Sequence, residues 1–422
     1  MLSEVMRLLS RLLVYGLIVY AAAAILYPDM GFAGSEVVGL PFGLTPYEIL
    51  AIPIFVLVAW TAIVSPPTER LFANRLALWT LLVYVIAQLA VVAPLALFVH
   101  DVAPRVVLEA LLPRLSLLLI PFLYWYGLRA LSQRRLQDAI GVAGAIVGAY
   151  AVFTFVASGP QFLLEGGDLR LRQLWGGATL LLGWVFLSRL LLYRQSLRNW
   201  MFVAFTAAGI VLTNHRSAYV ALAFALLLHF ALQPMSRRRW HIVVAALAIT
   251  VVVIFLAGGA LREQFDRSLN TVVDTNSPNA SLRLERWRVG YSYFRQHPFG
   301  DNVFNGQVFL LDEYGLTSAA HNFVVEMLDY EGLQGAVFYA FFLGQIAVIG
   351  WRNRLRDPVS GFMLTYLVFY LVFSGLNANF YLSHTIFLFA LPIASILSRN
   401  RTLDRLRPAA ASKRGTPSTT AL

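Results

Sequence analysis

The sequence carries three short polar segments whose side chains are suited to chemistry on a charged substrate. The first, residues 213–217, lies between two apolar runs and has Arg216 at the start of the second run, with His215 before it as a further candidate. A helix start has unpaired N–H groups and the positive end of the helix dipole, so an arginine there suits phosphate oxygens. The alternative is a short loop whose arginine reaches lipid headgroups.

The second segment concentrates arginines at positions 283, 286 and 288, around Glu285. Residues three apart share a helix face, so Arg283 and Arg286 can grip one polyanion, while Arg288 points elsewhere. The alternative is a solvated charged face that is partly paired with Glu285.

The third segment is His321-Asn322, directly before a long apolar run. A histidine can accept a proton near neutral pH, and the positive end of a helix favours its neutral, basic form. His321 is therefore a candidate general base, with Asn322 beside it as a candidate substrate-binding residue. The alternative is an interfacial histidine that only caps the helix.

Several other chemistries are excluded by what the sequence lacks. It contains no cysteine, which removes thiolate metal sites and cysteine nucleophiles. It has no His-x-x-x-His or Asp-x-Asp pairing for a divalent ion, and no glycine loop of the Walker type. We therefore expect metal-independent chemistry without a cofactor.

The elements that must position these segments are apolar helices. Of the 422 residues, 59% are hydrophobic and 13% are charged, against about 25% charged in a soluble domain. Segments of the length that a bilayer requires predict an all-α polytopic membrane protein with about twelve spans. The predicted spans are 12–27, 48–65, 76–99, 106–126, 139–157, 173–192, 199–213, 217–232, 241–258, 322–350, 359–376 and 380–398.

The arginines between the spans alternate in agreement with this count. The positive-inside rule makes their side cytoplasmic, places both termini there, and explains the net charge of +11 without nucleic acid as a partner. Those arginines are Arg7, Arg11, Arg70, Arg75, Arg129, Arg134, Arg135, Arg194, Arg198, Arg237, Arg238, Arg239, Arg352, Arg354, Arg356 and those of the tail.

Residues 1–398 are predicted to form a single transmembrane domain, and residues 399–422 a disordered cytoplasmic tail. A long outer loop, 259–320, is inserted in this domain and exceeds the usual connection of about 2 to 8 residues. In this loop Asn279 or Ser281 can cap an amphipathic helix that lies on the membrane surface or on the bundle. Its apolar stripe is Leu284, Trp287, Tyr291 and Phe294, and Pro298 and Gly300 end it.

The order of these motifs resembles the O-antigen ligase and O-antigen polymerase superfamily of bacterial envelope glycosyltransferases. The resemblance covers residues 213 to 335, and the other spans are similar in hydrophobicity and number. It rests on Asn214-His215-Arg216-Ser217-Ala218, Arg283-x-x-x-Trp287, His297-Pro298-x-Gly300, His321-Asn322-Phe323-x-x-Glu326 and Gly332-x-x-Gly335.

The resemblance implies a GT-C-like fold in the bacterial inner membrane, with an active site that faces the periplasm. It implies that an O-antigen glycan passes from undecaprenyl pyrophosphate to lipid A-core, with inversion and without a metal or cofactor. By position, Arg216 and Arg283 would bind the pyrophosphate, and His321 would deprotonate the attacking hydroxyl. Further contacts to donor, acceptor and membrane lipids would come from His215, Asn322, Arg286 and Arg288.

Other functions remain open at this point. An O-antigen polymerase, whose acceptor is another lipid-linked repeat, and a transferase that glycosylates protein share the same chemistry. A single large outer loop and the number of spans favour the ligase. A secondary transporter or lipid flippase, the alternative of another class, would carry charged residues along a path through the spans, where Arg114, Arg189 and Glu109 are the candidates.

Overall fold

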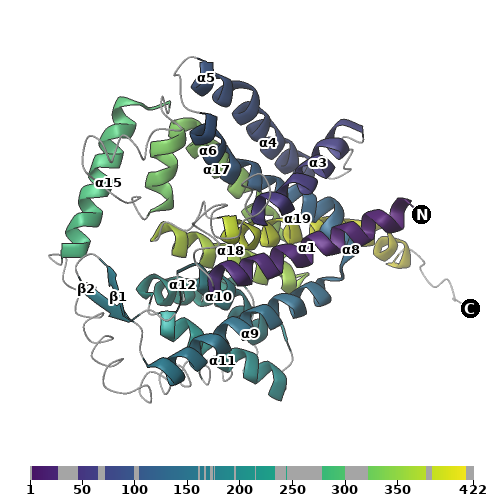
Figure 1. Cartoon of the computed structure of the whole chain (residues 1–422). Coiled ribbons are helices and arrows are strands. Elements are labelled where there is room, and N and C mark those ends of the chain that lie inside the picture. Colours follow the sequence, from purple (N-terminus) through teal and green to yellow (C-terminus); the bar gives the residue numbers. More distant parts are fainter. Residues whose placement is uncertain are drawn as a thin grey trace, which may run out of the picture.

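In the part of the chain that the structure describes, the protein is a bundle of helices with one short β-hairpin (Figure 1). All structural statements below concern that part. The computed structural model describes residues 2–26, 46–64, 72–98, 104–159, 162–165, 168–171, 174, 176–193, 196–213, 215–232, 244, 278–299, 322–376 and 383–414.

Most of the described helices are uninterrupted. They are α1 Leu2–Leu26, α3 Pro46–Val64, α9 Gln133–Ser158, α10 Gly176–Leu191, α11 Leu197–Thr213, α12 Arg216–Leu232, α15 Pro278–Gln296, α18 Pro358–Gly375 and α19 Ser383–Arg414. The helix α17 Phe323–Asn353 has non-helical backbone angles at Gly332.

Two stretches change helix type along their length. The first runs through α4 Phe72–Ala87, the π-helix η2 Gln88–Val92 and α5 Ala93–Phe98. The second runs through α6 Pro104–Leu115, the 3-10 helix η3 Ser116–Leu118, α7 Leu119–Phe122, the π-helix η4 Leu123–Gly127 and α8 Leu128–Ala130.

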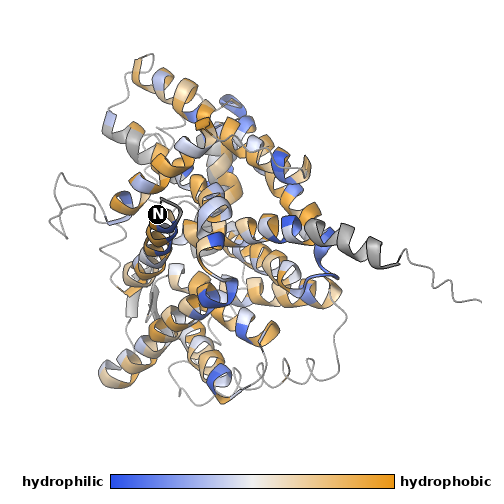
Figure 2. Cartoon of the chain, turned by 90° about the vertical axis from the view of Figure 1, so that its right-hand side faces the viewer, coloured by the Kyte–Doolittle hydropathy of each residue, from blue (hydrophilic) through white to orange (hydrophobic). Residues whose placement is uncertain are grey.

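The helices have the length and surface of membrane spans. Among the described residues, 6 helices are long and apolar enough to cross a membrane. Shorter apolar helices follow at Gly177–Leu191, Leu197–Thr213 and Ser217–Leu232. Hydrophobic residues cover most of the length of the bundle (Figure 2). Exposed side chains such as Val56, Phe98 and Val156 would be unfavourable in water but suit contact with lipid. The prediction of a polytopic helical membrane protein is thus confirmed.

The positions of the helices agree with the predicted spans. Each predicted span coincides with a helix except 241–258, which lies outside the described residues apart from residue 244. The total of about twelve spans therefore stays a prediction.

Loops that the arginine pattern assigns to one side lie together at one end of the bundle. Arg11 Nε donates to the Ala130 carbonyl oxygen at 2.7 Å, which joins α1 to α8. Arg399 Nε donates to Gln133 Oε1 at 2.8 Å and lies 3.7 Å from Asp357 Oδ2. We call this the arginine-rich end. Figure 1 shows the start of α1 and the far part of α19 at the same end, and α15 and the hairpin at the opposite end.

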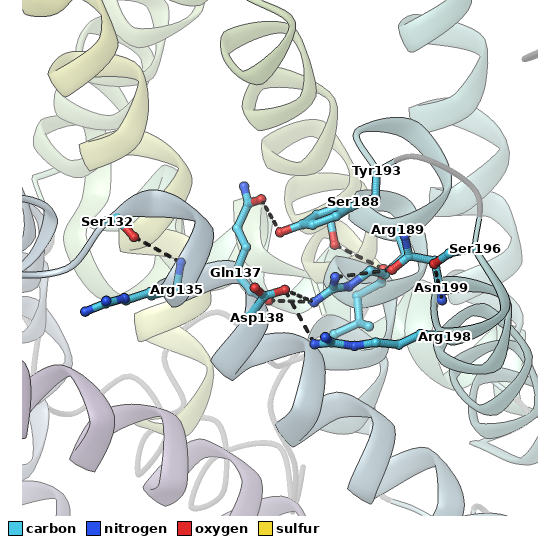
Figure 3. Close-up of polar contacts among 11 residues, drawn as sticks. Ser132, Arg135, Gln137, Asp138, Ser188, Arg189, Tyr193, Ser196, Arg198 and Asn199 are labelled. Atoms are coloured by element: carbon cyan, nitrogen blue, oxygen red, sulfur yellow. Dashed lines mark hydrogen bonds and ion pairs between the residues drawn. The ribbon is translucent and has the colours of Figure 1, made fainter.

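The arginine-rich end also contains a polar cluster around Arg189, at the ends of α9, α10 and α11 (Figure 3). Arg189 is buried, and its Nη2 lies 3.0 Å from Asp138 Oδ1. Nη2 also donates to the Gln137 carbonyl oxygen at 3.2 Å, and Nη1 donates to Asn199 Oδ1 at 3.4 Å. A buried guanidinium needs such partners to offset its lost hydration. Arg189 thus joins three helices.

The close approach of α9 and α11 depends on Gly148. A Cβ atom at this position would lie 2.4 Å from the Phe205 carbonyl oxygen, which is closer than real Cβ contacts allow. Small residues permit such contacts between helices in membranes, where packing rather than water drives association.

The hairpin was not predicted from the sequence. Strands β1 Phe162–Glu165 and β2 Asp168–Leu171 pair antiparallel, with Phe162 opposite Leu171 and Glu165 opposite Asp168. In the sequence, Gly166-Gly167 connects them, and a two-residue glycine pair between two short runs is a hairpin pattern. That pattern would have identified the hairpin, which hydropathy does not detect because the strands are so short.

The last helix also differs from expectation. α19 continues to Arg414, into the segment 399–422 that the sequence predicts to be disordered. Alanine, leucine and arginine in this segment are strong helix formers, so a helix that leaves the bundle can continue through them. Residues 415–422 lie outside the described part of the chain.

Candidate functional site

The first polar segment lies where α11 ends and α12 begins. α12 starts at Arg216, as predicted, and the amide N–H of Ala218 donates to the His215 carbonyl oxygen at 2.9 Å. His215 is only 6% exposed, and its ring meets the Phe373 ring edge-on, with centroids 6.0 Å apart. Arg216 therefore stands at a helix N-terminus, while its side chain lies outside the described part.

The second segment forms the predicted helix, α15, which packs against α17. Only part of the predicted apolar stripe is buried: Leu284 is 45% exposed and Tyr291 is 56% exposed, whereas Trp287 and Phe294 are half-buried. Gly290 and Tyr293 are buried, and the Tyr293 ring contacts the His297 ring. Leu284 and Tyr291 face outward, where apolar side chains at the end of a membrane bundle can meet lipid.

The three arginines of α15 differ in their surroundings. Arg286 is half-buried, and among the described residues its Nε has no hydrogen-bond partner. Arg288 is exposed. Arg283 precedes Arg286 by three residues, so it occupies the same face of the helix by register, although its side chain lies outside the described part. Arg286 and Arg288 thus differ in exposure, and the shared role of Arg283 and Arg286 stays a prediction.

The third segment leads into α17. His321 lies outside the described residues, and Asn322 is the N-cap residue of α17. Asn322 Oδ1 accepts hydrogen bonds from the amide nitrogens of Val324 at 2.9 Å and Val325 at 3.3 Å. These bonds satisfy two backbone donors at the helix start. The side-chain oxygen of Asn322 is therefore engaged in the cap.

A break in α17 connects the second and third segments. Gly332 adopts φ 62° and ψ −155°, a conformation that only glycine adopts readily. The next amide, that of Leu333, donates to the Pro298 carbonyl oxygen at 2.8 Å. The residues that follow α15 are thereby held against the break, which fixes α15 relative to the first turns of α17.

The three segments lie at the end of the bundle opposite the arginine-rich end. Phe373, which contacts His215, is near the end of α18, and α18 begins beside Asp357 at the arginine-rich end. α17 runs in the reverse direction, because Asn353 at its far end donates to Asn400 Oδ1 at 3.0 Å. The start of α17, and α15 with it, are thus at the same end as Arg216.

Comparison with known protein families supports this grouping. Residues 201–340 match the family model described as O-antigen ligase. Over these residues the chain is thus similar to the O-antigen ligase superfamily. The match covers α12, α15 and the first half of α17, and therefore all three polar segments. A search of curated proteins found no match.

Sequence reasoning missed one buried group inside the O-antigen ligase match. Glu331, directly before the break in α17, is 0% exposed, and its Oε1 lies 3.4 Å from Arg114 Nε. The Tyr84 hydroxyl donates to its other oxygen. We call Tyr84, Arg114 and Glu331 the Glu331 cluster. Glu331 could have been identified from the sequence, because an acidic residue within the apolar run of 322–350 is unusual at membrane depth.

An apolar groove runs between α4 and α17 toward the O-antigen ligase segments. It has a volume of about 710 Å³, and Phe299, just after α15, lies at its wall. Trp79, Val83, Val337 and Phe341 also line it. Such an apolar surface can bind a hydrocarbon chain, but it has few polar groups to form hydrogen bonds with a sugar.

Within the described ranges, no group of three or more His, Asp or Glu side chains is placed to hold a metal ion. The described part of the O-antigen ligase match offers a substrate anion two positively charged features, the N-terminus of α12 and the arginines of α15.

Proposed function

We propose that the protein transfers an O-antigen glycan from undecaprenyl pyrophosphate to lipid A-core, at the periplasmic face of the bacterial inner membrane. The observation that carries this proposal is that the start of α12, the helix α15 and the start of α17 lie at one end of the bundle. The O-antigen ligase match over residues 201–340 supports the same conclusion.

In this proposal the helix start at Arg216, together with Arg283, binds the pyrophosphate. The hydroxyl oxygen of the acceptor sugar attacks the anomeric carbon from the face opposite the phosphate and inverts that centre. The bond from the anomeric carbon to the phosphate oxygen breaks, and undecaprenyl pyrophosphate leaves with the electron pair. His321 takes the hydroxyl proton. Cations placed where charge develops on the leaving group stabilise the transition state, and a positioned base contributes about 10² to 10⁴-fold.

The other predicted substrate-binding residues receive supporting roles. Arg286, with a buried Nε and the same helix face as Arg283, is proposed as a second contact to the pyrophosphate. Arg288 is exposed and is proposed to contact the glycan. His215 and Asn322 are proposed to act mainly by holding the starts of α12 and α17, because one packs on Phe373 and the other caps α17.

The lipid part of the donor is proposed to lie in the apolar groove between α4 and α17. The groove opens on helix faces that carry exposed apolar residues such as Val83 and Val337, and Phe299 brings it beside α15. A prenyl chain in the groove would deliver its pyrophosphate to the end of the bundle at which Arg216 stands.

The proposed orientation follows from the arginine-rich end. That end is proposed to be cytoplasmic, which places both termini there and the three segments in the periplasm. Residues 1–398 would form one transmembrane domain, with 259–320 as its periplasmic insertion.

The charged residues in the spans support an enzyme rather than a transporter. Arg114 is paired with Glu331 and Arg189 with Asp138, whereas the charged residues of a transport path would face the substrate.

Deletion of the gene tests the reaction and separates the two acceptors. Accumulation of long lipid-linked polymer together with free lipid A-core is the expected result for a ligase. Core capped by single repeats would identify a polymerase instead. Normal lipopolysaccharide, or lipid-linked repeats trapped on the cytoplasmic side, would overturn the proposal, and the second of these outcomes would identify a flippase.

A further inference from the structure

The Glu331 cluster joins three parts of the membrane domain that are far apart in the sequence. Tyr84 comes from α4, Arg114 from α6 and Glu331 from α17. Arg114 and Glu331 are 4% and 0% exposed. The desolvation free energy of a buried ion pair exceeds the attraction between its charges unless further hydrogen bonds support it. A well-packed apolar pair would therefore stabilise the fold equally well. Stability alone therefore does not explain these charges.

Each of the three helices is irregular close to the cluster. Gly332 breaks α17 directly after Glu331. α6 gives way to the 3-10 helix η3 after Leu115, the residue that follows Arg114. α4 gives way to the π-helix η2 at Gln88, one turn after Tyr84. Interrupted helices at membrane depth occur where protein surrounds them, and they often accompany functional sites.

The packing of the cluster leaves space for the Glu331 side chain and holds it in place. A Cβ atom on Gly335 would lie 2.6 Å from Glu331 Oε2 and 2.4 Å from Glu331 Cβ, so the glycine leaves the space that this side chain fills. The Tyr84 ring stacks on the Phe338 ring, with centroids 3.8 Å apart, which orients its hydroxyl. The carboxylate is thus held from α4, from α6 and from its own helix.

We propose that the Glu331 cluster is a positioning group that sets the direction of α17 at its break, and so places the His321 segment and α15 relative to Arg216. The inference rests on the proposed function. Glu331 is fixed to α4 and α6, Gly332 turns the chain, and Leu333 holds the end of α15 through Pro298. A base or a phosphate-binding arginine displaced by about 1 Å loses on the order of 10²-fold in rate.

The first test is kinetic and uses Glu331→Gln, which keeps the size of the side chain and removes its charge. We expect kcat for glycan transfer by the full chain in vesicles to fall about 10²-fold, while KM for the lipid-linked donor stays within about twofold. Arg114→Lys, which keeps the charge, is expected to retain more activity than Arg114→Met. Tyr84→Phe removes only the hydroxyl contact and is expected to lower kcat several-fold. If Glu331→Gln does not fold, this milder variant tests the same role.

The matched control is Asp138→Asn, which breaks the Arg189 ion pair at the opposite end of the bundle. Both variants remove the carboxylate that pairs with a buried arginine, but the Asp138 side chain is 34% exposed, and Asp138 is remote from the three segments. A purely structural effect would lower the thermal stability of both variants and leave kcat per folded molecule unchanged in both. We expect kcat to fall for Glu331→Gln alone.

The second test measures position without measuring activity. Because the chain contains no cysteine, Phe224→Cys on α12 and Val324→Cys in the first turn of α17 can be spin-labelled without background. Both side chains are exposed. We expect Glu331→Gln to shift or broaden the distance distribution between the labels, and Asp138→Asn to leave it unchanged.

The outcomes distinguish this inference from the proposed function. Wild-type kcat and an unchanged label distance in Glu331→Gln, with His321→Ala and Arg216→Ala inactive, would overturn the inference and leave the function standing. Full transfer by His321→Ala and Arg216→Ala would overturn the function, and the label distances would then decide the positioning role alone.

Discussion

The amide N–H of Leu333 donates to the Pro298 carbonyl oxygen at 2.8 Å, and this bond ties the end of α15 to the break in α17. It is possible because Gly332 has a positive φ and turns the Leu333 amide out of the helical hydrogen-bond pattern. One backbone bond thus relates the helix that carries Arg283 to the helix that follows His321.

Gly332→Ala is expected to lower transfer and to destabilise the protein by about 1 to 3 kcal/mol, because alanine is strained at this φ. Transfer in vesicles and thermal unfolding in detergent measure the two effects. Gly344→Ala is the matched control on the same helix, since a Cβ there meets no atom within 4 Å. It should be neutral or slightly stabilising. Equal behaviour of the two variants would refute the role assigned to the break.

Arg216→Ala and His321→Ala are each expected to abolish glycan transfer and to leave the amount of protein in membranes intact. Loss of a general base costs about 10² to 10⁴-fold, and loss of a cation that stabilises the leaving group has a similar effect. Transfer of labelled glycan to lipid A-core measures the result. Arg216→Lys should recover only a small part, because lysine lacks the planar fork that binds phosphate oxygens.

Arg286→Ala and Arg288→Ala are expected to differ. Arg286 is half-buried, and its Nε has no hydrogen-bond partner among the described residues, so its loss should raise KM for the lipid-linked donor about tenfold, roughly the value of one charge-assisted hydrogen bond. Arg288 is exposed, and its loss should change KM by less than about twofold. Donor titrations in vesicles compare them. A larger effect at Arg288 would mean that the outward face of α15 meets the pyrophosphate.

Val337→Trp is expected to fill part of the groove between α4 and α17 and to raise KM for a long-chain donor. A donor with a short prenyl chain should be affected much less, because its tail does not need the groove. Val348→Trp is the control, since Val348 is exposed on the same helix outside the groove lining. An equal KM for both donors in Val337→Trp would place the prenyl chain elsewhere.

Gly148→Ala is expected to destabilise the bundle, because the added Cβ would lie 2.4 Å from the Phe205 carbonyl oxygen and push α9 away from α11. Overpacking of this kind costs about 1 to 3 kcal/mol. Thermal unfolding should show the loss, whereas kcat per folded molecule should stay near wild type. A fall in kcat without a fall in stability would connect the α9 to α11 contact with the site.

The sequence was sufficient to locate most of the described helices, whereas the roles of the three polar segments stay predictions. A membrane span can be recognised from its own residues, because its transfer into the bilayer depends on its own apolar composition and on the arginines that flank it. The helix in the long loop, α15, was predicted close to its observed bounds from its cap residues and from the Pro298 and Gly300 that follow it. The helix start at Arg216 was also predicted, whereas the N-cap role of Asn322 was not.

What the sequence did not reveal depends on partners distant along the chain. The pairing of Arg114 with Glu331 joins α6 to α17, and no local pattern connects them. The buried face of α15 is likewise set by α17, so only part of the predicted apolar stripe of α15 is buried. The change of α4 into a π-helix at Gln88 leaves no mark in hydropathy.

The pairing of Arg114 with Glu331 has a consequence for biosynthesis. Arg114 is synthesised long before Glu331, so α6 must enter the bilayer while its counter-ion has not yet been made. Until α17 arrives, the arginine lacks Glu331 as its counter-ion, and α6 is short and gives way to a 3-10 helix at Ser116. The N-terminal half therefore reaches its final arrangement only after the C-terminal half has been inserted, which makes assembly of this membrane domain a late event in translation.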